Sequence, residues 1–205
     1  MNNEKSYTVD NDTFATNPGN VILNPLVWIK YNILTPLILT TSLIVSIWLT
    51  TSISFWFFII SGLFIVINLF YWRRQKEHFR FGDSNGGIVI ATNPTLIAVT
   101  TDLTKGFGEY PVVKIIRYKA KGKIGDRIGT VALYSASDDE NMQHWIDFDP
   151  IPINYATNNI AEINRTIKSY DAEQWKKIEE RLLQVPKPYA VGLYKINEAT
   201  SDWTN

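Results

Sequence analysis

The feature that most constrains this chain is a stretch of 42 residues, from Tyr31 to Trp72, that contains no Asp, Glu, Lys, Arg or His. A helix needs roughly 20 apolar residues, each rising about 1.5 Å, to cross a bilayer. The stretch therefore predicts two crossings joined by a tight turn. Its most polar part, Thr50–Ser54, predicts the turn, with one helix over Ile33–Leu49 and a second over Phe55–Tyr71.

Aromatic side chains at the ends of the two predicted helices support the same division. Trp and Tyr favour membrane interfaces, because their rings are apolar while their N–H or O–H groups seek water. In a hairpin, the residues at the open end lie at one interface and those beside the turn lie at the other. The predicted membrane-interface anchors are Trp28, Tyr31, Trp48, Trp56, Tyr71 and Trp72.

Basic residues predict the side of the membrane that each end of the hairpin occupies. An excess of Lys and Arg in short flanking segments marks the cytoplasmic side. The predicted turn has no charge, whereas the open end is flanked by Lys30, Arg73, Arg74, Lys76 and Arg80. We therefore expect a multi-pass protein with both termini and its soluble domain in the cytoplasm.

The composition of the remaining chain predicts the domain organisation. We expect residues 1–26 to form a polar cytoplasmic tail and residues 27–72 to form the two-helix transmembrane hairpin. Residues 73–85 are rich in charge and are expected to be a basic juxtamembrane linker. Residues 86–197 are predicted to form the soluble domain, and residues 198–205 a second tail.

Strand signals followed by helix signals in residues 86–197 predict an α+β domain. Short β-branched runs separated by turns favour a small five-stranded barrel of the OB or SH3-like kind. Two C-terminal helices are expected next: Asn158 or Asn159 caps the first, and Asp171 caps the second in a capping box with Gln174. The five strands are expected at residues 87–92, 96–102, 112–121, 128–135 and 145–155, with 189–196 as a candidate for a returning last strand.

One part of this domain resembles a known family. The run His144–Thr157 reads His-Trp-Ile-Asp-Phe-Asp-Pro-Ile-Pro-Ile-Asn-Tyr-Ala-Thr, and a helix containing Trp175 follows it. Over residues 86–183 the chain is similar to an uncharacterised bacterial family of small two-span membrane proteins with a soluble β-rich domain of unknown function. The resemblance implies a bacterial inner (plasma) membrane location and the same architecture. It brings no assigned activity.

The sequence carries few of the residues that usually perform catalysis or hold metals. There is no Cys, and the two histidines, His78 and His144, are too far apart for a His-x3-His site. Common nucleotide-binding and hydrolase motifs are missing as well. We therefore expect no enzyme activity and no catalytic, cofactor-binding or metal-binding residues. The alternative of an enzyme rests on His144, Asp147 and Asp149.

Residues 114–127 form a strongly basic segment, with six basic residues and one acid, Asp126. Four of the basic residues alternate, so in a regular strand they line one face. A solvated outer face explains this pattern, and so does attraction to anionic headgroups. Single-stranded nucleic acid fits less well, because few aromatic residues are interleaved. The candidates for anionic-surface binding are Arg117, Lys119, Lys121 and Lys123.

Together these observations favour a membrane-anchored, non-enzymatic interaction module. Its cytoplasmic β domain is expected to bind a partner protein, as an adaptor, assembly factor or immunity-type inhibitor does, or to form a homo-oligomer. The alternative is a membrane-tethered domain that senses anionic lipids or a small ligand. The chain has 20 acidic and 20 basic residues, so no global charge favours nucleic acid. The expected partners are thus the lipid bilayer and a protein.

Overall fold

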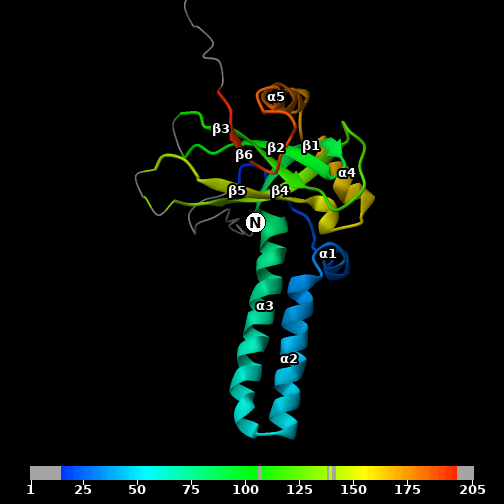
Figure 1. Ribbon diagram of the computed structural model, residues 1–205, viewed down its shortest axis with the longest axis vertical. Coiled ribbons are helices and arrows are strands. Elements are labelled where there is room, and N and C mark those ends of the chain that lie inside the picture. The colour runs from blue at the N-terminus through cyan, green and yellow to red at the C-terminus, as the bar shows by residue number, and fades with distance from the viewer. Residues whose placement is uncertain (1–14, 106–107, 138, 140–141, 198–205) are drawn as a thin grey trace, which may run out of the picture.

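The computed structural model describes residues 15–105, 108–137, 139 and 142–197. Two long antiparallel helices form a stalk that carries a β-rich domain at one end (Figure 1). In chain order the described elements are α1 Pro25–Tyr31, α2 Leu34–Ser52, the 3-10 turn η1 Phe55–Phe57, α3 Phe58–Phe81, β1 Asp83–Thr92, β2 Thr95–Asp102, β3 Pro111–Arg117, β4 Arg127–Ser135, β5 Asp147–Pro152, the 3-10 turn η2 Ile153–Tyr155, α4 Ile160–Lys168, α5 Ala172–Leu182 and β6 Gly192–Lys195.

The predicted hairpin corresponds to α2 and α3. Among the described residues, two helical segments are long and apolar enough to cross a membrane: Leu34–Ser52 with 19 residues and Phe55–Phe81 with 27 residues. Only 11% and 6% of their most apolar windows are buried. Neither segment is therefore the core helix of a soluble protein, and so much exposed apolar surface indicates membrane association.

Polar side chains join the two helices of the stalk. Near the turn, Thr50 Oγ1 and Ser61 Oγ lie 3.0 Å apart, and further along Asn68 Nδ2 donates to Leu39 O at 3.2 Å. Ser46 and Ser61 are buried. Hydrocarbon offers such groups no partner, so bonds between the helices satisfy Thr50, Ser61 and Asn68, while Ser46 Oγ donates to Leu43 O of its own helix at 2.8 Å. The small and hydroxylated faces of α2 and α3 therefore pack against each other.

The C-terminal part of α3 belongs to the domain. Within it Phe79 is fully buried, and His78 Nε2 lies 2.9 Å from Val131 O. The helix ends at Gly82, whose N–H donates to His78 O, and β1 begins at the next residue. Residues 73–85 are therefore not the linker that we expected. The basic side chains of this segment are exposed on one side of α3, whereas the other side of the helix is buried in the domain. The charge of the segment indicated the exposed side and gave no sign of the buried one.

The domain is built on a six-stranded antiparallel sheet with the strand order β5-β4-β1-β2-β3-β6. The five predicted strands are present, although β3 ends at Arg117 and β5 at Pro152, earlier than expected. The prediction of a five-stranded OB or SH3-like barrel was wrong. After α5 the chain returns to form β6 along the edge of β3, so within the described residues β3 pairs with β6 and not with β5.

The sheet curls around a central core. Segments beyond β2 and before β5 meet through a bridge between Thr104 and His144 and through a bond from Trp145 N to Leu103 O of 2.7 Å. The enclosed cluster of buried side chains joins strands of the sheet to α3 and the N-terminal segment. It includes Val21, Phe79, Ile97, Val99, Leu103, Val112, Val131 and Phe148.

The other face of the sheet packs against α5. Trp175 and Ile178 of that helix are buried with Ile88 of β1, and Gly86 provides the space that this contact needs, since a Cβ there would lie 3.1 Å from the Trp175 ring. The predicted capping box of Asp171 is present. The cap of α4 is Asn159, the second of the two residues that we proposed.

The described part of the expected N-terminal tail packs against the domain. Gly19 N and Val21 N donate to backbone carbonyls at the end of α3, and Val21 and Leu23 are buried. Asn24 then caps α1, an element that was not predicted. The apolar pair Val21 and Leu23 explains why a mostly polar segment binds the domain. Residues 1–14 and 198–205, the other parts of the two predicted tails, lie outside the described residues.

Candidate functional site

Aromatic side chains form a junction between the stalk and the domain. Trp28 of α1 packs edge-on against Phe79, with ring centroids 5.6 Å apart, and its Nε1 donates to Tyr71 OH at 2.7 Å. Tyr31 stacks on Tyr155 of η2 at 4.5 Å. The junction therefore connects α1 and α3, at the open end of the stalk, to the core of the domain.

The six predicted interface anchors fall into two groups. Beside the turn, Trp48 and Trp56 are 57% and 76% exposed, as residues facing an interface must be. At the open end, Trp28 is only 5% exposed, so it is a core residue and not an interface anchor. The domain encloses its ring because α1 lies directly beneath η2. The remaining residues of this group are half-buried: Tyr31, Tyr71 and Trp72.

Lys119 connects the basic segment to this junction. Its Nζ donates to Tyr31 O at 2.6 Å and to Asn32 Oδ1 at 2.7 Å. Tyr31 is the last residue of α1, and the carbonyl end of a helix favours a cation. The backbone N–H of Lys119 also donates to the Tyr155 hydroxyl at 2.5 Å. Burial raises the pKa of Tyr155 to about 12, so this acceptor stays neutral over the physiological pH range.

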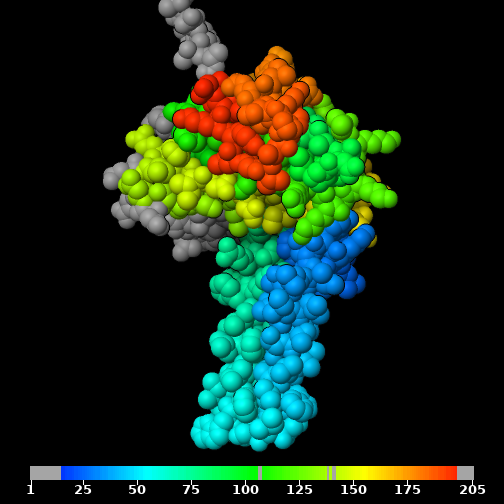
Figure 2. Space-filling model, viewed as in Figure 1, coloured from blue at the N-terminus to red at the C-terminus, as the bar shows by residue number. Residues whose placement is uncertain are grey.

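The four candidate anionic-surface residues do not lie along one regular strand, as we had expected. β3 ends at Arg117, and Lys119, Lys121 and Lys123 belong to the β3–β4 loop, residues 118–126. All four side chains are exposed. Figure 2 shows the yellow-green atoms of this loop projecting from the flank of the domain, on the side where α1 lies. The alternating basic pattern thus marked a surface loop.

The backbone of the β3–β4 loop is held in place by hydrogen bonds. Gly125 N donates to Val89 O at 2.8 Å, and Val89 N donates to Asp126 O at 3.0 Å. The Asp126 carboxylate accepts the N–H of Lys123 at 2.7 Å. Gly125 has φ +91°, a left-handed conformation that glycine adopts without strain. The loop therefore presents its basic side chains from a defined backbone.

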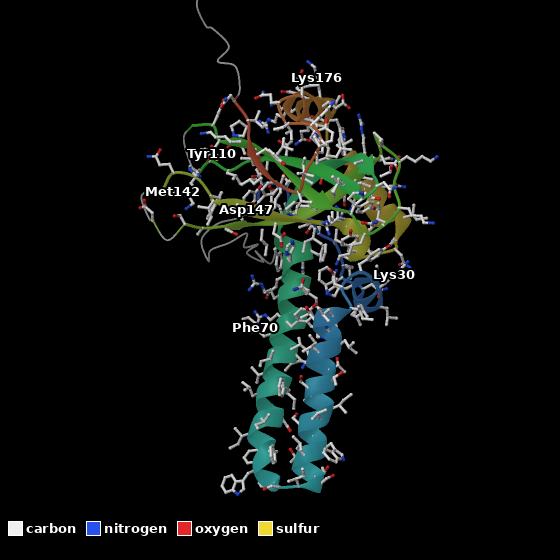
Figure 3. The ribbon with its side chains drawn as sticks, in the orientation of Figure 1. Lys30, Phe70, Tyr110, Met142, Asp147 and Lys176 are labelled. Atoms are coloured by element: carbon white, nitrogen blue, oxygen red, sulfur yellow. The ribbon has the colours of Figure 1, made fainter. Side chains whose placement is uncertain are left out.

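The residues of the enzyme alternative serve as structural contacts. His144 stacks on Tyr110 at 3.8 Å, and Asp147 forms an ion pair with Lys114 at 2.8 Å. Asp149 is an exposed residue of the edge strand β5. Figure 3 shows Tyr110 and Asp147 on one flank of the domain, and Lys30 beneath the other. Within the described residues, no three His, Cys, Asp or Glu side chains gather as metal ligands would.

A buried polar network at the start of β1 was not foreseen from the sequence. Tyr134 OH donates to Asp83 Oδ2 at 2.7 Å and lies 2.7 Å from Thr101 Oγ1. Burial raises the pKa of Asp83, against hydrogen bonds that lower it. Burial likewise raises the pKa of Tyr134, and the nearby Asp83 carboxylate adds to the rise. The three side chains come from β1, β2 and β4, so their spacing in the sequence gives no signal of the network.

The face of the domain farthest from the stalk carries exposed apolar side chains. We call this the outward face; it is formed by α5, β6 and the segment between them (Figure 1). Leu183 and Val191 are exposed there, Leu183 to 82%. Leu193 of β6 is exposed on the opposite face of the sheet, because it pairs with Lys114, whereas its neighbour Tyr194 packs in the cluster beneath α5. β6 pairs with β3, and in the part of the chain described no strand pairs with its other edge. Exposed apolar side chains beside an open strand edge are typical of protein-binding surfaces.

Comparison with known sequences identifies the family. The family described as "Protein of unknown function (DUF3239)" matches residues 73–185, more than half of the chain. The chain belongs to this family. The DUF3239 region begins at Arg73, so it includes the part of α3 that packs into the core. The resemblance to an uncharacterised bacterial family, seen in the sequence, is confirmed.

A solved crystal structure is similar to the DUF3239 chain. It is a protein of Corynebacterium diphtheriae, provisionally described as a membrane protein, and the two sequences are 20% identical. The similarity covers 56% of this chain and 100% of that chain, with a TM-score of 0.48. No curated protein matches the chain.

Proposed function

We propose that this protein is a membrane-anchored, non-enzymatic interaction module. In this proposal α2 and α3 cross the inner membrane, and the domain and both termini lie in the cytoplasm. Helix length and composition support the crossing. Orientation is supported by the charge difference between the uncharged turn and the open end, where the basic residues are Lys30, Arg73, Arg74, Lys76 and Arg80.

The observation that carries the proposal is the rigid attachment of the domain to the stalk. α3 runs without a break into the core, where Phe79 is fully buried, and Trp28 fastens α1 to the same core. A domain on a flexible tether presents every face in turn. This domain instead holds α5 on the side opposite the stalk, with β6 beside β3 in the sheet beneath it (Figure 1). A rigid attachment of this kind keeps the same face of the domain available to partner proteins.

The outward face is the proposed binding surface for a partner protein. Leu183 and Val191 supply apolar contacts, and the open edge of β6 supplies backbone groups to which a partner strand can add. An adaptor, an assembly factor and an immunity-type inhibitor all require a fixed surface of this kind.

Site-specific photo-crosslinking tests this proposal. A photoreactive amino acid at Leu183 or Val191, in the full chain in native membranes, is expected to give a discrete crosslinked species. The matched control carries the same group at Ile124, which is exposed on the β3–β4 loop. The variant Leu183→Asp, with the photoreactive group at Val191, is expected to lose the crosslink.

Three outcomes decide the question. A crosslink to another protein from the outward face alone supports a hetero-partner. A crosslink to a second copy of the chain replaces that partner with a homo-oligomer. Absence of specific crosslinks from the outward face, or the same crosslinks from Ile124, contradicts the proposal.

A further inference from the structure

The geometry of the stalk places α1 and the β3–β4 loop at the membrane surface. α2 begins at Leu34 and has 19 residues, which span about 28 Å, close to the roughly 30 Å of a bilayer's hydrocarbon core. α1 ends just before it, at Tyr31, and is seen nearly end-on beneath the domain in Figure 1, so it runs across the direction of α2. Because Lys119 binds Tyr31 O and Asn32 Oδ1, the start of the loop lies at the same level. From there the loop rises along the flank of the domain to Arg127, which lies over the Trp175 ring of α5 at 4.6 Å.

Large apolar side chains are exposed at this level. Ile22 and Leu26, before and within α1, are 80% and 78% exposed. Ile22 N donates to Glu162 Oε1 at 2.8 Å, and this bond brings the segment beside the first turn of α4, where Ile160 is also exposed. Apolar side chains in such a position gain free energy when they enter the boundary between headgroups and acyl chains.

Basic side chains accompany these apolar ones. Lys30 of α1 and Lys121 and Lys123 of the loop are exposed, and Figure 3 shows Lys30 where the domain meets the stalk. The acids on the same elements are Asp126 and Glu162, and the carboxylate of each accepts a backbone N–H. A surface that combines exposed apolar residues with excess positive charge is complementary to an anionic lipid surface.

We propose that residues 21–33 and 117–123, which together we call the collar, bind the anionic phospholipid headgroups of the leaflet next to the domain. Lys121 and Lys123 contact lipid phosphates, while Ile22 and Leu26 insert among the upper acyl chains. Lys119 is a positioning residue, because its ammonium is bonded to α1 and fixes the loop there. The inference rests on the proposed membrane anchoring and is independent of a partner at the outward face.

The test uses the full chain in lipid nanodiscs. The chain has no cysteine, so Ile124→Cys creates a single site for a fluorophore on the loop. Headgroup spin-labelled lipid serves as the quencher, in discs of phosphatidylcholine alone or mixed with phosphatidylglycerol. We expect stronger quenching in the anionic discs, and a decrease of that excess as salt rises.

Matched charge variants identify the residues responsible. Loss of each basic residue is expected to weaken contact with anionic lipid about fivefold. Lys121→Glu/Lys123→Glu should therefore lower the quenching in anionic discs to the level in neutral discs. Lys176→Glu/Lys177→Glu makes the same change of charge on α5, at the end opposite the stalk in Figure 3, and should leave the quenching unchanged.

The remaining arms separate the ways in which the inference can fail. A label at Ile44→Cys in α2, with acyl-chain bromolipid as quencher, must be quenched in both kinds of disc; otherwise the membrane anchoring itself is wrong. If Ile44 is quenched and the loop label shows no preference for anionic discs, the anchoring stands and headgroup binding is overturned. If sodium phosphate protects the loop label in neutral discs as well as in anionic ones, and the label shows no preference for anionic lipid, the ligand is free phosphate and headgroup binding is overturned. If the loop label is inaccessible in native membranes but not in nanodiscs of either lipid composition, the collar binds a protein and the inference is overturned.

Discussion

The two ends of the stalk carry the same types of aromatic residue and use them in different ways. Beside the turn, Trp48 and Trp56 are 57% and 76% exposed, as membrane-facing rings are. At the open end, Trp28 is enclosed by Phe79 and bonded to Tyr71. The difference teaches that an aromatic residue next to an apolar helix marks an interface only where no folded domain reaches it. Where one does, the same ring becomes part of a protein core.

The largest expected effect is on the stability of the domain when Trp28 and Trp56 are each replaced by alanine. Trp28→Ala removes a buried aromatic ring from the core and is expected to lower the free energy of unfolding of the domain by about 3–5 kcal/mol. Trp56→Ala should change it by less than about 0.5 kcal/mol, because its ring does not touch the domain. Amide hydrogen exchange of β1 to β4 in nanodiscs measures both. Equal losses in the two variants would show that Trp28 is an interface residue after all.

A smaller effect is expected from the hydroxyl that binds Trp28. Tyr71→Phe removes the acceptor of Trp28 Nε1 and leaves a buried N–H without a partner, which costs about 1–3 kcal/mol. The control is Tyr189→Phe, in the cluster on the other face of the sheet. Thermal unfolding followed by near-UV circular dichroism distinguishes the two. If both variants melt together with the parent chain, the bond between α1 and α3 contributes nothing to the attachment.

The smallest expected effect is a pH dependence of the free energy of unfolding. It arises at the open end of the stalk, where Asp83 lies at the start of β1. Asp83 loses its proton near its ordinary value of 3.8 in the unfolded chain, but at higher pH in the folded domain. Between those two values the folded state binds more protons, so the free energy of unfolding falls as pH rises and then levels off above the folded pKa. Asp83→Asn still accepts the Tyr134 hydroxyl and should remove this part of the slope. Unfolding in urea across pH 4 to 7 measures it, and identical slopes would contradict the expectation.

The stalk was predictable because membrane constraints are local. A run of apolar residues long enough to cross, interrupted once by Thr50–Ser54, specifies two helices whatever the domain does. The same holds for the strands β1 to β5 and for the Asp171 capping box, each of which is encoded by neighbouring residues. These parts of the fold depend on short-range chemistry.

The candidate sites depend on long-range contacts and were harder to predict. Lys119 was chosen for an alternating pattern, but its role comes from Tyr31 and Asn32, nearly ninety residues earlier. The exposed edge at the outward face exists because Gly192–Lys195 joins β3, a pairing that neither segment specifies alone. Val21 and Leu23 were overlooked because two apolar residues in a polar stretch show no periodicity.

If α2 and α3 cross the membrane as proposed, the unbroken course of α3 makes the domain responsive to bilayer thickness. A membrane helix adjusts to a thinner or thicker bilayer chiefly by tilting. Since α3 ends inside the core at Phe79, and α1 binds the same core through Trp28, the stalk cannot tilt and leave the domain upright. Any hydrophobic mismatch therefore tilts the whole domain together with the stalk, so that one flank moves toward the lipid and the other moves away. In this arrangement the lipid composition of the membrane sets the angle at which α5 faces away from the bilayer.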